Sequence, residues 1–391
     1  MRTYRELLAV KEFAPLFAVS SAQVAGSTVS GLALGVLVYS ATGSPLLSAL
    51  SMFGPSLAQL VGATTLMSAA DRLAPRAALT GVAVWFALGT LVLAVPGLPV
   101  WALFAVVLGQ GLAASLGGGV RLGLLNEILP EDGYLLGRSV LNMSTGVLQI
   151  CGYAVGGLLV SLLSPRGALL AGAALYLVAA LTSRFGLSAR PPRAKGRPSV
   201  AETWRANRAL WSAPPRRVLL VALWVPNGLI VGAESLFVAY DPVRAGALFA
   251  FAALGMLAGD LLAGRFIPRF WRGRLGAPLR LLLAVPYLGF FLHPPLPVAV
   301  ALVTLASAGF AAGLLLQEQL LALTPAELSG QALGLQSSGT MAMQGVGAAL
   351  AGGVAQLSSP ALAMGTMAVL SAAVTLALAP RLRRSAVLAG V

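Results

Sequence analysis

The chain has 391 residues, of which 58% are hydrophobic and only 10% are charged. A water-soluble domain usually carries about 25% charged residues, so this composition excludes a soluble protein and predicts an integral membrane protein. The net charge of +14 would suit a nucleic-acid-binding protein, but the basic residues lie between long apolar segments, and we expect no nucleic-acid partner.

Long intervals without Asp, Glu, Lys or Arg divide the sequence into apolar segments. A helix that crosses a bilayer needs about 20 mostly apolar residues, and the intervals 13–70, 77–120 and 328–380 are each long enough for two. Turn-forming residues split these intervals. In chain order we predict an all-α integral membrane protein with twelve transmembrane helices, at residues 14–40, 45–69, 77–95, 99–124, 139–162, 167–187, 218–240, 245–264, 276–292, 297–323, 331–356 and 360–380.

The distribution of basic residues predicts the orientation of the chain. With the N-terminus in the cytoplasm, the external loops contain only two basic residues, Arg166 and Arg244, and all others fall on the cytoplasmic side. Cytoplasmic loops are enriched in Lys and Arg, which sets topology. We therefore expect a multi-pass protein of the cytoplasmic (inner) membrane of a prokaryote, with both termini in the cytoplasm.

A polar and basic segment at residues 188–217 divides the predicted spans six and six. We interpret it as a cytoplasmic linker between an N-terminal half, 1–187, and a C-terminal half, 218–391. Its middle part, 200–211, is compatible with a helix that lies on the membrane surface, where basic residues meet membrane lipid.

The two halves show signs of an internal repeat. A shift of 195 residues places Thr145 on Thr340, Gln149 on Gln344 and Gly152 on Gly347, among other identities, at equivalent topological positions. Parallel halves related by an axis along the membrane normal are a known plan for transporters.

The loop after the second predicted span reads Ala-Asp-Arg-Leu-Ala-Pro-Arg and ends at Arg76. It resembles the signature loop of the major facilitator superfamily, Gly-x-x-x-Asp-Arg-x-Gly-Arg/Lys, with Met67 and Ala74 in place of the glycines. The resemblance implies that Asp71, Arg72 and Arg76 form a conformational switch whose charge pairs make and break between states. The alternative is that these charges only mark the cytoplasmic face.

Two further segments are similar to motifs of the same superfamily. Gln110 begins Gln-Gly-Leu-Ala-Ala, which resembles the second motif, although Val107 replaces the Arg implicated in proton transfer. Residues 152–157 resemble the Gly-rich motif of antiporters, with Tyr153 in place of proline. Residues 39–46 are similar to the first external turn of the siderophore and macrolide efflux branch of the drug:proton antiporters. The resemblance implies twelve helices in two six-helix halves.

Ionisable residues inside predicted spans are costly and indicate function by default. Glu234 lies deep in the seventh span, seven residues after Asn227, so both fall on one helical face. Because apolar neighbours disfavour the charged form of a carboxyl group, Glu234 is the first candidate for coupling proton movement to transport. The alternative is a structural hydrogen bond to a neighbouring helix. Arg121 follows Gln110 by eleven residues, so both fall on one helical face. It is a candidate for binding an anionic substrate group or for neutralising Glu318. The alternative is an Arg side chain that snorkels to the cytoplasmic interface.

Amide side chains at helical spacing mark further candidate positions on the helices that line the central cavity in this superfamily. They are Gln23, Asn142, Gln149 and Gln344. Each alone is more often a contact between helices. Glycines expected to allow close packing of helices are Gly152, Gly156, Gly157 and Gly352.

The pattern predicts a secondary active transporter that exports small amphipathic organic molecules by proton antiport and alternating access. The sequence contains no nucleophile–base motif, phosphate-binding loop or metal-ligand cluster, so we expect no enzyme activity, no metal and no cofactor beyond the coupling proton. We expect a monomer with a small-molecule substrate. An importer or lipid flippase on the same fold, or a non-transporting membrane receptor or scaffold, remains an alternative.

Overall fold

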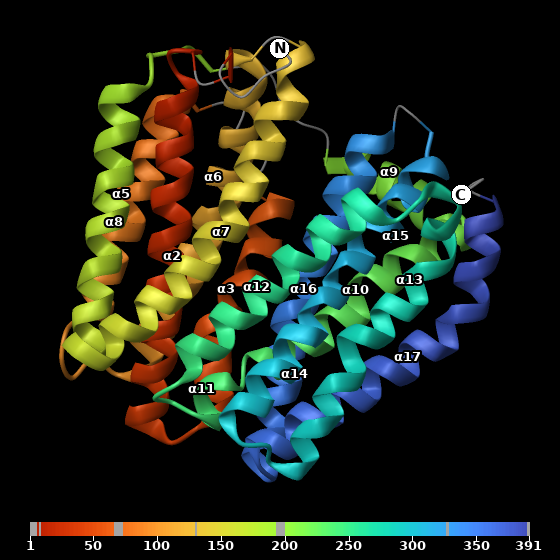
Figure 1. The fold of residues 1–391 in the computed structure, drawn as a ribbon. Helices are drawn as coiled ribbons and strands as arrows, with labels where there is room; N and C mark the ends of the chain where they lie inside the picture. The colour runs from red at the N-terminus through yellow and green to blue at the C-terminus, as the bar shows by residue number, and fades with distance from the viewer. Residues whose placement is uncertain are drawn as a thin grey trace. The chain divides into compact units, whose positions relative to one another are not determined.

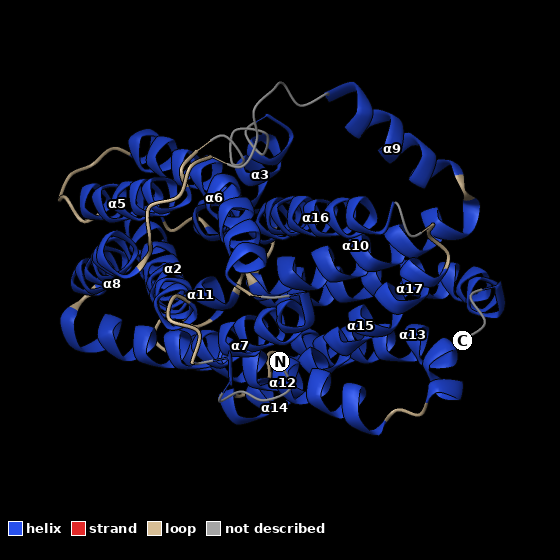
Figure 2. Ribbon diagram, turned by 90° about the horizontal axis from the view of Figure 1, so that it is seen from above, coloured by secondary structure: helices blue, strands red, loops and turns tan. Residues whose placement is uncertain are grey.

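A computed structural model of the chain describes residues 6–7, 9–65, 73–129, 131–192, 200–325 and 328–388. Within these residues the chain is helical and contains no strand (Figure 2). The α-helices are labelled in Figure 1. The helices are α2 (Phe13–Thr42), α3 (Pro45–Thr65), α5 (Pro75–Leu93), α6 (Val100–Ile128), α7 (Glu131–Leu163), α8 (Pro165–Gly186), α9 (Val200–Ser212), α10 (Pro214–Glu234), α11 (Phe237–Tyr240), α12 (Ala245–Phe266), α13 (Arg269–Ala284), the 3-10 helix η1 (Val285–Leu292), α14 (Leu296–Ala308), the 3-10 helix η2 (Gly309–Ala311), α15 (Ala312–Ala322), α16 (Ser329–Leu357) and α17 (Pro360–Leu388).

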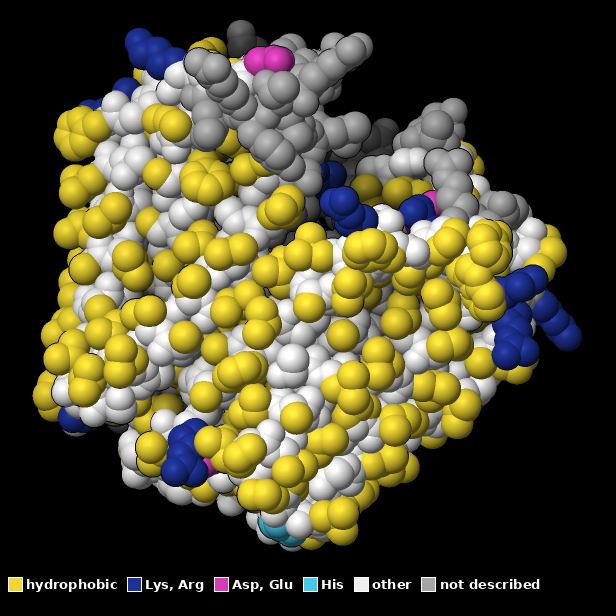
Figure 3. All heavy atoms as spheres, viewed as in Figure 1, with side chains coloured by type: hydrophobic (Ala, Val, Ile, Leu, Met, Phe, Trp, Pro, Cys, Tyr) yellow, Lys and Arg dark blue, Asp and Glu magenta, His cyan; other side chains and the backbone are white. Residues whose placement is uncertain are grey.

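Eleven segments of the described chain are helices long and apolar enough to cross a membrane. The one predicted span outside these eleven, 331–356, corresponds to α16, which has 29 residues and no charged side chain, but whose glutamines, serines and glycines lower its hydropathy. Figure 3 shows hydrophobic side chains spread over the middle of the face in view, as expected of a lipid-facing surface. The prediction of an all-α, twelve-helix membrane protein is confirmed.

Several predicted boundaries were wrong, for a common reason. α7 begins at Glu131, about two turns before the predicted start at residue 139, and α17 continues past residue 380 to Leu388. In both places the predicted span was bounded by a charged residue, whereas the helix continues beyond it. Hydropathy reports where a chain leaves the apolar layer, whereas backbone hydrogen bonding can continue into water.

Three predicted spans contain breaks in the α-helical pattern. The seventh consists of α10 and the short α11, and the tenth consists of α14, η2 and α15. The ninth begins as α13 and continues as the 3-10 helix η1, which has Pro286 near its start. Proline has no N–H group to donate to the preceding turn, which favours a change of helix type there.

Contacts between residues group the chain into two compact units. Unit 1 comprises residues 1–43, 54–197 and 243–250, and unit 2 comprises residues 44–53, 198–242 and 251–391. The beginning of α3 therefore belongs to unit 2, and the beginning of α12 belongs to unit 1. The half boundaries at residues 187 and 218 stay a prediction.

Each unit is held together by contacts among a few long helices. In unit 1, α2 packs against α7 and α8, and α5 packs against α6 and α8. In unit 2, α10 packs against α16 and α17, and α13 packs against α15 and α17. The helix expected within residues 200–211 is observed as α9, which packs against α10 and α16, and its position on the membrane surface stays a prediction.

Candidate functional site

The last residue of α10, Glu234, carries a buried carboxyl group in unit 2. Its side chain is held by two hydroxyl groups: Tyr287 of η1 donates to Oε1 at 3.3 Å, and Ser307 of α14 donates to the same atom at 3.4 Å. Glu234 is 9% exposed, and both donors are fully buried. In the part of the chain that is described, no cation forms an ion pair with Glu234. Among the described residues, a negative charge at this position is therefore stabilised by neutral donors.

Aromatic rings surround the hydroxyl donor of Glu234. Tyr287 stacks on Phe290, with ring centroids 5.6 Å apart, and Tyr240 meets Phe290 edge to face at 5.3 Å. The Tyr240 hydroxyl group donates to the carbonyl oxygen of Pro294 at 2.8 Å. Tyr287 and Phe290 are fully buried, so the hydroxyl donor of Glu234 is held in an apolar aromatic cluster.

Two of the predicted amide residues lie together in unit 2. The Nε2 atom of Gln344 on α16 donates to Oδ1 of Asn227 on α10 at 3.3 Å, and both side chains are half-buried. Asn227 and Glu234 lie on one helix but have different neighbours, because Asn227 contacts α16 whereas Glu234 contacts η1 and α14. α10 thus offers one polar group to α16 and another to η1 and α14.

In unit 1, two predicted site residues bind to neighbouring helices. Nη1 of Arg121 on α6 donates to the hydroxyl group of Ser20 on α2 at 3.0 Å. Nε2 of Gln110, also on α6, donates to the Phe86 carbonyl oxygen and the Thr90 hydroxyl group, each at 3.2 Å. Both side chains join helices within the unit.

The remaining candidate carboxylate, Glu318, is paired. Its carboxylate lies 3.2 Å from Nη1 of Arg272, and the side chain is 40% exposed. Both residues belong to unit 2, so Arg272 supplies the neutralising charge for which Arg121 was considered.

The other predicted residues are placed less fully. Gln23 on α2 and Gln149 on α7 are half-buried, and Arg76 is half-buried in the first turn of α5. Asp71, Arg72 and the side chain of Asn142 lie outside the described residues.

Two of the three predicted packing glycines of α7 face α2. A Cβ atom at Gly152 would lie 2.9 Å from Cβ of Thr28, and one at Gly156 would lie 3.3 Å from Cα of Val29. Both approaches are closer than ordinary van der Waals contact, so a larger residue would displace the neighbouring helix.

The repeat-related glycine on α16 makes an equivalent contact. A Cβ atom at Gly347 would clash with the carbonyl oxygen of Gly228 on α10. Gly347 follows Gly152 by 195 residues, and its partner follows Thr28 by 200 (228 − 28). The contact of α7 with α2 is therefore repeated between α16 and α10.

A second pair of glycines, Gly157 and Gly352, also makes equivalent contacts in the two units. Each contacts a helix that comes from the other half of the sequence. A Cβ atom at Gly157 would lie 3.0 Å from Cα of Gly246 on α12, and one at Gly352 would lie 2.7 Å from Cα of Leu46 on α3. These partners are again 200 residues apart (246 − 46). The internal repeat seen in the sequence thus extends to contacts between helices.

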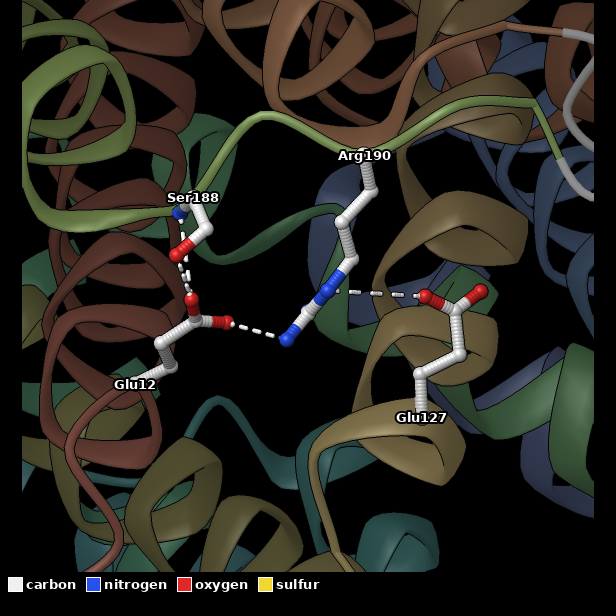
Figure 4. Close-up of polar contacts among 4 residues, drawn as sticks. All are labelled: Glu12, Glu127, Ser188 and Arg190. Carbon is white, nitrogen blue, oxygen red and sulfur yellow. Dashed lines mark hydrogen bonds and ion pairs between the residues drawn. The ribbon is translucent and has the colours of Figure 1, made fainter.

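A polar network joins three segments of unit 1, as Figure 4 shows. Nη2 of Arg190 lies 2.8 Å from Oε2 of Glu12, and Nε of Arg190 lies 4.0 Å from Oε2 of Glu127. The backbone N–H and the hydroxyl group of Ser188 both donate to Glu12. The network attaches the chain after α8 to the start of α2 and the end of α6.

Sequence reasoning missed two buried polar residues of unit 2. Arg280 on α13 is 1% exposed; its Nη2 donates to the Leu223 carbonyl oxygen at 3.4 Å, while Nε and Nη1 have no hydrogen-bond partner among the described residues. The amide of Gln319 on α15 is 1% exposed and likewise has no partner there. Arg280 is the fifth residue of the predicted span 276–292. A basic residue so close to the end of a span is expected to reach water, so its burial could not be inferred from the sequence.

Comparison with known proteins assigns the family. The model of the Major Facilitator Superfamily matches residues 16–317 of the 391. The chain belongs to the major facilitator superfamily. A comparison with curated proteins found no match by sequence.

Solved structures of major facilitator transporters share the fold over nearly the whole chain. A bacterial homologue of the human lysosomal transporter Spinster, inward-facing and unoccupied, has 17% identity and a TM-score of 0.70 and covers 100% of this chain and 94% of its own. A mutant form of the nucleoside transporter NupG has 14% identity and a TM-score of 0.75 and covers 95% and 99%. A POT family transporter bound to a thioalcohol-conjugated peptide has 11% identity and a TM-score of 0.73 and covers 95% and 96%.

Membership of the major facilitator superfamily identifies a multi-pass membrane transporter, a class that is generally not enzymatic. At these identities the structural likeness concerns the fold alone, and the site residues come from this chain.

Proposed function

We propose that this transporter is a secondary active exporter of small amphipathic organic molecules, driven by proton antiport through alternating access. The observation that carries the proposal is Glu234, a buried carboxyl group that accepts hydrogen bonds from two neutral hydroxyl groups and has no ion-pair partner in the described chain. An ionisable residue within a span is expensive to maintain, which favours a role in a proton pathway.

The proposed step at Glu234 is the binding and release of a proton by its carboxyl group. In the charged state, Oε1 accepts from Tyr287 and Ser307. Protonation removes the charge and makes the carboxyl group a donor as well as an acceptor. The hydrogen bonds that Oε1 accepts from the two hydroxyl groups are then weaker. A carboxyl group whose hydrogen bonds differ between its two states can connect proton loading to movement of the helices that carry the donors, here η1 and α14.

The amphipathic nature of the proposed substrate rests on two features. The amide groups of Asn227 and Gln344 are half-buried on two packed helices and offer neutral hydrogen-bonding groups, while the residues next to them in these helices are mostly apolar. The turn at residues 39–46 is similar to that of siderophore and macrolide exporters. Sites for small molecules are mostly apolar with few polar groups.

A flux assay in proteoliposomes tests this function. A panel of amphipathic compounds is loaded, and movement is measured with and without an imposed pH gradient. We expect at least one compound to move against its concentration gradient only when protons flow in the opposite direction. Flux of equal size without the gradient would contradict antiport, flux with the protons would identify an importer, and absence of flux for every compound class, lipids included, would favour a receptor.

We further propose that the protein resides in the cytoplasmic membrane of a prokaryote as a monomer, with both termini in the cytoplasm. Single cysteines at Pro192 and Val387, both exposed, test the orientation in a Cys151→Ser background. We expect membrane-impermeant maleimide to label neither in intact cells and both in inverted vesicles. Labelling of either site from outside would reverse the orientation.

A further inference from the structure

The linker helix α9 presents basic and aromatic side chains beside the spans of unit 2. Figure 2 shows α9 on the side of α16 and α10 that faces away from α13, α15 and α17. Leu210 is buried, at 1% exposure, whereas Arg205, Arg208 and Trp211 are exposed. The helix is therefore anchored by its apolar residue and leaves two guanidinium groups and an indole accessible.

A pocket of about 610 Å³ lies between α9 and α16. It is lined by Arg205, Asn207, Arg208, Trp211 and Leu335. Pockets for small ligands usually range from about 300 to 1,000 Å³. This pocket combines two cationic groups with an apolar wall.

Three contacts hold the walls of the pocket. Nε2 of Gln331 at the start of α16 donates to Oδ1 of Asn207 at 2.6 Å. Nε1 of Trp224 on α10 donates to the Gln336 carbonyl oxygen at 2.9 Å, and Trp211 stacks on Trp224 with ring centroids 5.6 Å apart and planes 11° apart. The pocket is thus lined by α9 and α16, and Trp224 of α10 supports it from behind Trp211.

The position of the pocket suits a ligand that is partly in the membrane. α10 begins at Pro214 and α16 at Ser329, so the pocket lies at the ends of two spans that meet the linker. Leu335 stands six residues into α16, about 9 Å along the helix axis. Tryptophan is enriched at membrane–water interfaces, where its ring meets both apolar and polar groups.

We propose that this pocket binds an anionic phospholipid, with its phosphate at Arg205 and Arg208 and the first carbons of an acyl chain against Trp211 and Leu335. Guanidinium groups match phosphate oxygens in two-point hydrogen bonds. The apolar wall favours a lipid over free phosphate, because inorganic phosphate would gain nothing from the indole and the leucine. Binding at a helix that joins the two halves of the sequence would make stability depend on lipid composition.

Thermal unfolding of the purified full-length protein tests the lipid site. Midpoints are measured in detergent micelles containing phosphatidylglycerol or phosphatidylcholine, because a ligand that binds only the folded state raises the midpoint. We expect phosphatidylglycerol to raise the wild-type midpoint more than phosphatidylcholine, and the double variant Arg205→Gln/Arg208→Gln to lose more than about half of that difference.

The matched control is Arg383→Gln/Arg384→Gln, which removes the same charge from an exposed pair on α17. We expect it to keep the lipid effect. Equal loss in both double variants, or no loss in the first, would overturn the site in favour of general attraction to the negative surface. An equal midpoint rise with inorganic phosphate at matched ionic strength would also overturn it.

A second readout reports the apolar wall. Phosphatidylglycerol with brominated acyl chains quenches tryptophan that lies within contact of the chains. We expect stronger quenching in the wild type than in Trp211→Phe, measured as the fraction of fluorescence lost. Equal fractions would contradict acyl contact with Trp211. Neither experiment requires transport, so failure of the lipid site and failure of the proposed function are distinguishable.

Discussion

Apart from the partly exposed Arg272–Glu318 pair of unit 2, the candidate ionisable side chains have different surroundings in unit 1 and unit 2. In unit 1, Arg190 lies between Glu12 and Glu127 near helix ends, and Arg121 donates to a hydroxyl group on a neighbouring helix. In unit 2, Glu234 is enclosed with neutral donors, and Arg280 is enclosed with two nitrogen atoms that have no hydrogen-bond partner in the described chain. Paired charges near helix ends hold helices together. Enclosed groups without counter-charges instead suit a change of protonation or partner, so we look for coupling in unit 2.

The largest expected effect is that of Glu234→Gln. Glutamine keeps the shape of the protonated side chain but cannot release a proton, so gradient-driven flux should fall to the background of empty liposomes. Substrate binding, measured by ligand-dependent thermal stabilisation, should remain.

The matched control for Glu234→Gln lies in unit 1. Glu127→Gln makes the same chemical change at a carboxyl group that is 31% exposed, and it should keep flux near the wild-type level. Full gradient-driven export by Glu234→Gln would remove its role and would break the distinction between the units.

Glycine substitutions test the feature that the two units share. Gly352→Leu would drive a side chain into Leu46, and Gly156→Leu would press on Val29, so transport should be lost in both while the protein still inserts. Overpacking typically costs about 1–3 kcal/mol. Gly353→Leu is the control, because a Cβ atom there meets nothing within 4 Å. Normal flux in the first two variants, measured in proteoliposomes, would dismiss tight packing as a requirement.

Two arginine substitutions compare a cation of unit 1 that binds a hydroxyl group with an enclosed cation of unit 2. Arg121→Met removes the hydrogen bond to Ser20 and should cost about 1–2 kcal/mol of stability. Arg280→Met removes an enclosed charge that lacks a counter-charge in the described chain, and because burying such a charge is costly, the replacement should be neutral or stabilising. Thermal unfolding in detergent measures both. If Arg280→Met is as damaging as Arg121→Met, then Arg280 has a stabilising partner and the contrast between the units fails.

The smallest expected effect is that of Arg190→Gln in unit 1. Partly exposed ion pairs usually contribute about 1 kcal/mol or less, so the midpoint of unfolding should fall only slightly. The loss should also shrink as salt is added, because ions screen such pairs. A large, salt-independent loss would show that the network does more than attach the segment after α8.

The fold could be predicted from the sequence because lipid imposes a simple rule. Apolar segments of sufficient length must become helices, and the spacing of basic residues separates them. Helix ends such as Glu131 and Leu388 could not be located in this way, because charge marks the membrane boundary and not the end of backbone hydrogen bonding.

The candidate site was only partly accessible from the sequence. Spacing along one helix identified Glu234 and Asn227, but the hydroxyl donor Tyr287 comes from a different span, and only tertiary packing brings it to Glu234. The Asn227–Gln344 contact joins residues 117 positions apart. Arg280 was missed because a basic residue near the end of an apolar segment has the same pattern whether it snorkels to water or turns inward.

The 3-10 winding of η1 makes the direction of Tyr287 depend on helix type. In a 3-10 helix, residues three apart eclipse one another, which is why Tyr287 and Phe290 stack. An α-helix turns by about 100° per residue and a 3-10 helix by about 120°, so rewinding the two steps from Val285 to Tyr287 would rotate the phenol by about 40°. η1 would also shorten, since its rise per residue would fall from about 2.0 to 1.5 Å. A change in pitch over one short stretch of chain would thereby withdraw one hydroxyl donor from Glu234 without moving a whole helix.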